Sequence, residues 1–120
     1  MTSKELRDYC YSIGLIDTDF IFKDIYTSGY RFNAEFVNSY DFIVAWDKSK
    51  DCVVVANGCV IDEDYQSKCK IRMTGSMCVE NDKEIKTHIN DLIKSVQENI
   101  KFLKLKQMKK KINMIEGDFE

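Results

Sequence analysis

Two apolar segments separated by a short polar loop stand at the centre of the chain. The stretch from Phe42 to Ile61 is rich in β-branched residues on both sides of the loop Asp47–Asp51, which is too short for anything but a tight reversal. Near-continuous hydrophobicity in both arms is typical of well-buried strands. The pattern therefore predicts a β-hairpin around which the other elements are built.

The chain before this hairpin begins with a helical pattern and then changes to a strand pattern. A capping box at residues 2–5, followed by apolar residues at helical spacing as far as Gly14, predicts a short amphipathic helix. From Phe20 onward the apolar positions alternate, which predicts a strand, a turn at Thr27–Gly29 and a return strand over Tyr30–Phe36.

After the hairpin the chain returns to a helical pattern. Asn57–Gly58 interrupts the second arm and predicts either a bulge or a tight turn into a separate strand. The alternation over Cys69–Thr74 predicts a last, half-exposed strand. A second capping box, Asn81–Glu84, opens a long helix. Its apolar stripe recurs every three or four residues, at Ile85, Ile89, Leu92, Val96, Ile100 and Leu103.

In the distal half of this helix the apolar positions cover a wider sector and shift gradually around the helix axis. If the helix is unbroken to Ile115, it is about 50 Å long at 1.5 Å per residue. A domain of this size has a diameter of about 26–28 Å. Either the helix bends near Lys104–Gln107, or its distal half contacts a second copy or a partner. For that contact, which we expect to give a homodimer, the residues are Phe102, Leu105, Met108, Ile112 and Ile115.

These elements predict one α+β domain of 120 residues. It has a short N-terminal helix, a four- to five-stranded antiparallel sheet and a long C-terminal amphipathic helix. Residues 1–81 form the helix-and-sheet body, and residues 82–120 form the long helix of the same domain. No family signature is recognisable, and this fold class occurs with many unrelated functions.

The amino-acid composition suggests a cellular compartment and a type of source genome. The cysteines are odd in number, scattered and mostly set among apolar residues, which favours reduced thiols in the cytoplasm. We expect no secretory signal, because the N-terminal residues are polar and lack an apolar h-region. We expect no membrane span, because no apolar run approaches 18 residues. The chain has no proline and is rich in Lys, Ile, Asn and Asp. This composition points to an AT-rich genome such as that of a low-GC bacterium, one of its phages or a large virus.

The reactive residue types do not form a catalytic or metal-binding motif. His88 is the single histidine, three residues before Asp91, and the cysteines show no Cys-x-x-Cys spacing. A Cys78–His88 pair is a conceivable nucleophile and base, but burial as small hydrophobic residues explains the cysteines more simply. We therefore expect no metal, no cofactor and no enzymatic activity.

Acidic residues are concentrated in the body of the molecule. Residues 1–81 carry nine basic and thirteen acidic residues, whereas residues 82–111 carry nine lysines and four acidic residues. The densest acidic group is Asp62–Asp64. It lacks the glycine and the terminal glutamate of a calcium-binding loop, and a solvent-exposed loop is sufficient to explain it. The functional alternative is an acidic sheet end that docks on a basic partner, formed by Asp47, Asp51, Asp62, Glu63, Asp64 and Glu80.

The lysines of the distal helix allow two interpretations. A solvated helix face accounts for them, and contact with nucleic-acid phosphates is the alternative. Arginine is absent from this helix although base-edge recognition favours arginine, so nucleic acid is not the favoured partner. The candidate phosphate contacts are Lys104, Lys109, Lys110 and Lys111.

Three functional hypotheses follow. The favoured one is a non-enzymatic protein-binding module, in its most specific form a phage or mobile-element inhibitor that occludes a host nuclease-type defence complex. The second is a nucleic-acid-binding accessory protein that uses the lysine-rich helix. The third is a small-ligand binder or enzyme with a pocket between sheet and helix, where Cys78, His88 or Asp91 would act.

Overall fold

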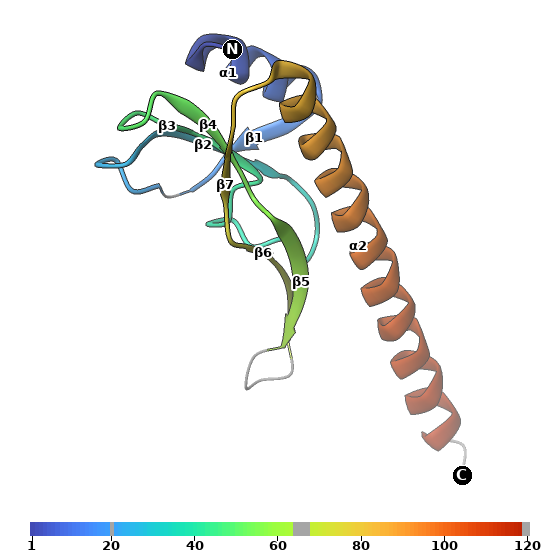
Figure 1. Cartoon of the computed structure of the whole chain (residues 1–120). Helices are drawn as coiled ribbons and strands as arrows, with labels where there is room; N and C mark the ends of the chain where they lie inside the picture. The colour runs from blue at the N-terminus through green and yellow to red at the C-terminus, as the bar shows by residue number, and fades with distance from the viewer. Residues whose placement is uncertain (20, 64–67, 119–120) are drawn as a thin grey trace.

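The computed structural model describes residues 1–19, 21–63 and 68–118, with the side chains of the last helix described as far as Lys110. It has the α+β architecture expected from the sequence pattern (Figure 1). The elements are α1 (Ser3–Ser12), β1 (Leu15–Asp17), β2 (Tyr26–Phe32), β3 (Val44–Asp47), β4 (Cys52–Val55), β5 (Gly58–Glu63), β6 (Cys69–Thr74), β7 (Met77–Val79) and α2 (Asp82–Asp118).

The strands form two antiparallel sheets. The larger has five strands in the order β1-β2-β3-β4-β7, which confirms the predicted strand number, and the smaller pairs β5 with β6. The central hairpin is confirmed: β3 and β4 pair from Val44 opposite Val55 to Asp47 opposite Cys52. At Asn57–Gly58 the sequence allowed a bulge or a turn into a separate strand. The structure has the separate strand, because β5 begins at Gly58 and belongs to the two-stranded sheet.

The predicted turn at Thr27–Gly29 is wrong, because β2 runs through these residues with a bulge between Tyr26 and Ser28. Gly29 is required for another reason. A Cβ atom there would lie 3.0 Å from Ile21 Cγ2 and 3.0 Å from Thr18 Oγ1, so the glycine lets a neighbouring segment cross the strand closely.

Two strands of three residues each were not predicted, and one predicted strand is shorter than expected. The return strand ends at Phe32, and Phe36 has a φ of 70°, which turns the chain away from an extended path. β1 pairs Leu15 with Phe32 at one edge of the sheet. At the other edge β7 follows β6, so Cys69–Thr74 is not the last strand. Phe20 lies outside the described residues.

Both predicted capping residues initiate their helices. Thr2 Oγ1 accepts a hydrogen bond from the backbone N–H of Glu5 at 3.1 Å. Asn81 Oδ1 accepts from the N–H groups of Lys83 and Glu84 at 2.9 and 3.2 Å. Each cap satisfies N–H groups that the helix itself leaves without partners, which fixes where the helix begins.

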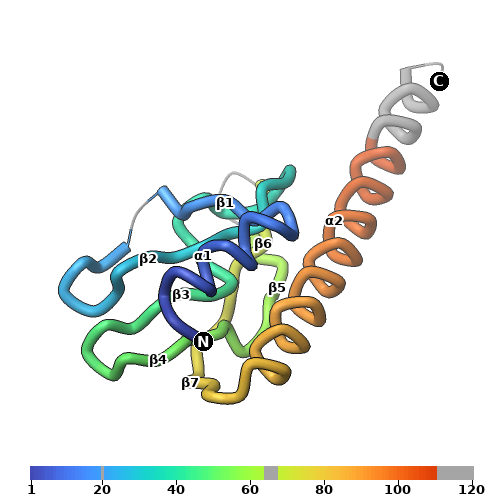
Figure 2. The backbone as a smooth tube through the Cα atoms, turned by 90° about the horizontal axis from the view of Figure 1, so that it is seen from above, coloured from blue at the N-terminus to red at the C-terminus, as the bar shows by residue number. Residues whose placement is uncertain are grey.

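The main core lies between the five-stranded sheet and the two helices that cover it (Figure 2). The first half of α2 contributes its apolar side to this core. Fully buried residues of both helices and of the central strands meet there, namely Leu6, Cys10, Val44, Val55, Ile85 and Ile89. Burying this apolar area is the main force that fixes α2 on the sheet.

α2 continues as one helix from Asp82 to Asp118, without the bend considered near Lys104–Gln107. The molecule is 62 Å long and 27 Å wide, because this helix runs past the sheet body (Figure 1). A second, smaller core joins the helix to the β5–β6 hairpin through Ile71, Val96 and Leu103. Leu103 is the last residue of α2 with a described side chain that is buried.

Candidate interaction surfaces around the long helix

Around and beyond Leu103, three apolar side chains of α2 point away from the body of the molecule. Leu103 is 2% exposed, whereas Phe102, Leu105 and Met108 are 59%, 58% and 58% exposed. An α-helix turns about 100° per residue, so Leu105 lies about 160° around the helix from Leu103. We call Phe102, Leu105 and Met108 the outer stripe. The other two residues predicted for this contact, Ile112 and Ile115, have side chains outside the described part of the helix.

Exposed apolar side chains at this spacing form a surface that water solvates poorly. They lie on consecutive turns of the distal helix, on the side away from the β5–β6 hairpin. Surface hydrophobic residues are usually scattered singly, whereas a contiguous apolar patch indicates an interaction site. None of the helices in the described residues is long and apolar enough to cross a membrane.

The lysines of the distal helix lie on several sides of it. Lys104 Nζ lies 3.8 Å from Glu35 Oε2, on the side of the segment that follows β2. Lys110 instead faces the β5–β6 hairpin, where it lines a groove, and Lys109 is exposed. The side chain of Lys111 lies outside the described residues. The four candidate phosphate contacts therefore do not form one continuous row among the described side chains.

The structure also brings together lysines that sequence reasoning did not select. Lys68, Lys70 and Lys106 line the same groove as Lys110, although two of them lie more than thirty residues earlier in the chain. A signal for Lys106 was present, since positions 106 and 110 continue the helical spacing of the buried stripe that ends at Leu103.

Asp47 is used inside the β3–β4 turn, which corrects its assignment to a docking surface. Its Oδ1 accepts hydrogen bonds from Ser49 Oγ at 2.7 Å and from the N–H groups of Ser49 and Lys50 at 2.9 and 3.1 Å. The Ser49 hydroxyl, with help from these N–H groups, holds the pKa of Asp47 below its ordinary value, against the opposing effect of burial. The side chain is 5% exposed and is not available to a partner.

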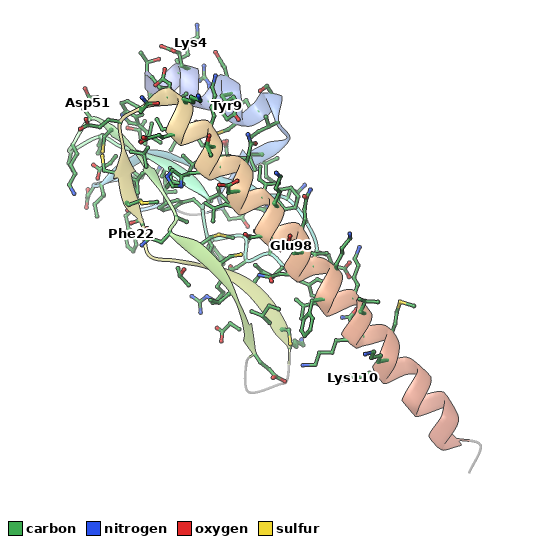
Figure 3. The ribbon with its side chains drawn as sticks, turned by 45° about the vertical axis from the view of Figure 1, so that its right-hand side comes forward. Lys4, Tyr9, Phe22, Asp51, Glu98 and Lys110 are labelled. Carbon is green, nitrogen blue, oxygen red and sulfur yellow. The ribbon has the colours of Figure 1, made fainter. Side chains whose placement is uncertain are left out.

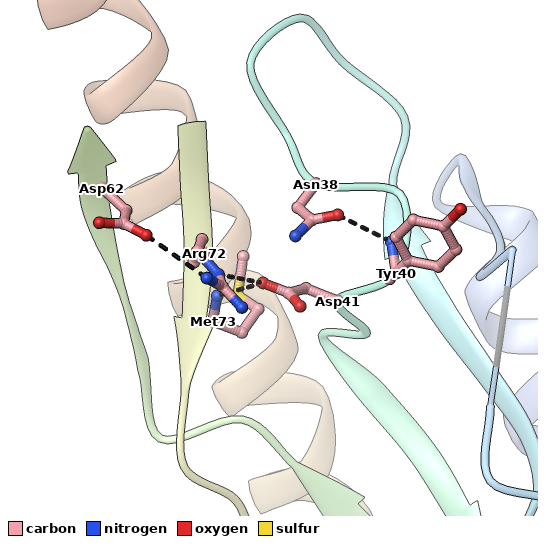
Figure 4. A network of polar contacts seen from close by, with 6 residues as sticks. All are labelled: Asn38, Tyr40, Asp41, Asp62, Arg72 and Met73. Atoms are coloured by element: carbon pink, nitrogen blue, oxygen red, sulfur yellow. Dashed lines mark hydrogen bonds and ion pairs between the residues drawn. The ribbon is translucent and has the colours of Figure 1, made fainter. Parts of the chain in front are cut away.

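Asp62 takes part in a network that connects the two sheets (Figure 4). Arg72 Nη1 lies 3.4 Å from Asp62 Oδ2, and Arg72 Nε lies 3.8 Å from Asp41 Oδ2. Asp41 Oδ2 also accepts from the N–H of Met73 at 3.1 Å. Asn38 Oδ1 accepts from the N–H of Tyr40 in the adjoining turn at 3.1 Å. The carboxylate of Asp62 thus has a partner within the protein.

The predicted acidic residues lie at two places rather than at one sheet end. Asp51 lies in the β3–β4 turn, and Figure 3 shows it far from the β5–β6 hairpin, which carries Glu63. Glu80 directly follows β7, whose Val79 pairs with Val53 of β4, so it lies at the same sheet end as Asp51, and Asp64 lies outside the described residues. The expectation fails because it placed both hairpins in one sheet, whereas β5 and β6 form a sheet of their own.

Among the described residues two thiols are neighbours, those of Cys52 and Cys78 on the paired strands β4 and β7. Burial raises the pKa of Cys10 to about 12, and burial with the neighbouring Cys78 thiol raises that of Cys52 to about 12. Both shifts disfavour the thiolate that a nucleophile requires. Cys78 is exposed, contrary to the expectation that burial explains every cysteine, and His88 is half-buried on α2.

No group of three or more potential metal ligands is present among the described residues. The groove between the hairpin and α2 is lined by none of Cys78, His88 and Asp91. These positions do not support the pocket chemistry of the third hypothesis.

Comparisons with known proteins give no match: no family model, no curated protein and no solved structure resembles the chain closely enough to be matched.

Proposed function

We propose that this protein is a non-enzymatic protein-binding module that associates through the outer stripe of α2. The observation that carries the proposal is the exposure of Phe102, Leu105 and Met108, which lie about 100–160° around the helix from the buried Leu103. Covering such a surface removes apolar area from water, which is the main favourable term in protein association.

A second copy of the chain is the partner that the sequence of the stripe favours. Leu105, Met108, Ile112 and Ile115 are spaced three, four and three residues apart, which is the heptad spacing of helices that pair side by side. The lysine-rich segment from Lys101 is followed by an acidic segment from Glu116 to Glu120. Antiparallel pairing would bring each acidic segment near the lysines of the other copy and so favours that orientation.

Replacing Leu105 with glutamate tests the proposal. A carboxylate in the middle of the stripe would have to be buried without a partner, so the Leu105→Glu variant should be monomeric at concentrations where the wild type is dimeric. Sedimentation velocity between 1 and about 200 μM measures this. The fold should be unaffected because Leu105 is 58% exposed, which circular dichroism and thermal unfolding check.

Val60→Glu is the matched control. Val60 is also an exposed apolar residue, at 48%, but it lies on β5 away from the stripe, and the substitution changes the charge equally. This variant should self-associate as the wild type does. A wild type that stays monomeric throughout the concentration range, or a dimer that Leu105→Glu leaves intact, would refute the proposal.

The composition supports a narrower form of this proposal, in which the module is a cytoplasmic inhibitor made by a phage or mobile element. The absence of proline and the abundance of Lys, Ile, Asn and Asp support this form. It predicts that the purified protein lowers the activity of a host nuclease-type defence complex. Loss of that inhibition in Leu105→Glu, with inhibition retained in Val60→Glu, would connect the activity to the stripe.

A further inference from the structure

A groove runs between β6 and the distal half of α2, on the side of the helix opposite the outer stripe. Its volume is about 520 Å³, which is within the range of sites that enclose a ligand of several residues or rings. Figure 3 shows Lys110 on the part of α2 beside the β5–β6 hairpin. The floor of the groove is apolar and is formed by Phe36, Val37, Cys69 and Leu103.

The rim of this groove is positively charged. Lys68 and Lys70 line it from the hairpin, Lys106 and Lys110 line it from α2, and no carboxylate is among its described lining residues. Lys70, Lys106 and Lys110 form no ion pair with any described residue. The groove thus concentrates positive charge in a chain whose net charge is −2.

The acidic residue opposite Lys70 in the hairpin has another partner. Asp62 lies directly opposite Lys70 in the β5–β6 register, but its carboxylate is 3.4 Å from Arg72 Nη1. The Arg72 network in Figure 4 therefore holds the Asp62 carboxylate and leaves Lys70 to face the groove. The site is complementary to an anionic ligand.

The backbone of β6 adds a second feature, an uncovered strand edge. Ile71 N donates to Phe36 O at 2.8 Å, and Ile71 O accepts from Asn38 N at 3.3 Å, so both groups point away from β5. Backbone groups of a strand alternate in direction, so those of Cys69 point to the same side. The covering segment runs parallel to β6, and its backbone pairing starts at Phe36, whose positive φ bends the chain there, so the pairing does not extend to Cys69. Among the described residues, the structure gives Cys69 no backbone partner on that side.

We propose that this groove binds an extended acidic peptide segment of another protein. The segment would pair with the edge of β6 at Cys69, place its carboxylates against the lysines and rest one apolar side chain on the floor at Leu103. Strand addition at an exposed edge is an established mode of peptide recognition, in which the backbone supplies affinity and side-chain contacts supply specificity. This site is separate from the outer stripe and does not depend on self-association.

An acidic peptide fits these observations better than nucleic acid does. A strand edge matches a peptide backbone and has no counterpart in a sugar-phosphate chain. The rim also has no arginine, the residue that recognises phosphate and bases with paired hydrogen bonds. The floor offers a place for one apolar side chain.

Fluorescence anisotropy with a six-residue peptide that carries fluorescein on its N-terminus, fluorescein-Glu-Asp-Leu-Glu-Val-Glu-amide, tests the proposal. The wild type should bind the peptide with a Kd below 1 mM, and Lys106→Gln combined with Lys110→Gln should raise the Kd at least about tenfold. Lys101→Gln combined with Lys104→Gln is the control, because it removes the same charge from the same helix outside the groove. The control should change the Kd less than about twofold.

Two further measurements test whether the peptide pairs with the strand edge and whether its binding is independent of the outer stripe. A peptide N-methylated at alternate residues should lose binding if it pairs with the strand edge. Measuring the peptide on Leu105→Glu as well as on the wild type separates this site from the stripe, since binding should be the same on both.

Three outcomes would overturn the proposal. The first is absence of binding up to 1 mM. The second is an equal loss of affinity in both lysine pairs, which would indicate general electrostatic attraction. The third is tighter, salt-sensitive binding of a single-stranded oligonucleotide that the groove lysines control, which would assign the groove to phosphates.

Discussion

The two halves of α2 meet the rest of the molecule in opposite ways. From Ile85 to Val96 the apolar side is packed on the body and buried. Farther along, Leu103 is the last buried residue, the outer stripe faces solvent, and Lys106 and Lys110 line the groove beside the hairpin. The helix is continuous through both halves. A single amphipathic helix can therefore form part of the core along one half and present an interaction surface along the other. The side of the helix on which the apolar residues fall decides whether a segment joins the core or presents an exposed surface.

Proline substitutions should give the largest difference between the halves. In the Leu105→Glu background, where self-association should not contribute, Ser95→Pro should lower the free energy of unfolding by about 3 kcal/mol or more. The ring removes a helical hydrogen bond in the half that is packed on the sheet. Lys109→Pro should cost less than about 1 kcal/mol, because the distal half can open without exposing the core. Urea unfolding measures both variants, and equal losses would show that the distal half folds as part of the core.

Truncating one apolar side chain in each half sharpens the same comparison. Ile89 is fully buried, so Ile89→Ala should lower the free energy of unfolding by about 2–5 kcal/mol through lost transfer energy and the cavity left behind. Leu105 is mostly exposed, so Leu105→Ala should change it by no more than about 0.5 kcal/mol. Unfolding curves of the monomer, at low micromolar concentration, provide the measurement. A large loss for Leu105→Ala would place that side chain in a folded interface.

The dependence of stability on pH should arise in the sheet body and give the smallest effect. Folding lowers the pKa of Asp47, so its stabilising contribution is complete well above the ordinary value of 3.8 and declines as the pH falls below that value. Asp47→Asn keeps the amide oxygen as an acceptor but removes the charge. The wild type should therefore be more stable than this variant at pH 7, and the difference should shrink below about pH 4.

Ser49→Ala provides the intermediate case. It removes the hydroxyl that contributes most to the lowered pKa of Asp47 but leaves the two N–H donors in place. Its stability should therefore depend on pH less than that of the wild type and more than that of Asp47→Asn. Urea unfolding between pH 3 and 7 tests the series. A difference that stays constant over this range would mean that another carboxyl group controls the acid response.

Features set by nearby residues were predictable from the sequence. The hairpin between β3 and β4, both helix caps and the bounds of β6 agree with the expectations, because each depends on residues within a few positions of one another. β1 and β7 were missed because three residues are too few to show a period of two. Gly29 was interpreted as a turn because the requirement for a glycine comes from a segment that crosses it.

The candidate surfaces were predictable to different degrees. The outer stripe was identified from spacing alone, since a helix converts spacing directly into direction. The acidic surface was not a good prediction, because Asp47 serves its own turn and Asp62 binds Arg72 across the hairpin. The groove was missed because Lys70 and Lys110 are forty residues apart in the sequence.

By itself, the sequence determined where the helices start, that one of them is long, and which of its residues share a side. These properties follow from backbone hydrogen bonds and side-chain geometry over a few residues. Only the tertiary structure decided which side is covered. It separated β5 and β6 from the main sheet and laid them along α2, which buried Leu103, left Leu105 in water and closed a lysine-lined groove. The reason is physical: burial depends on segments that meet in space, and local spacing does not specify which segments will meet.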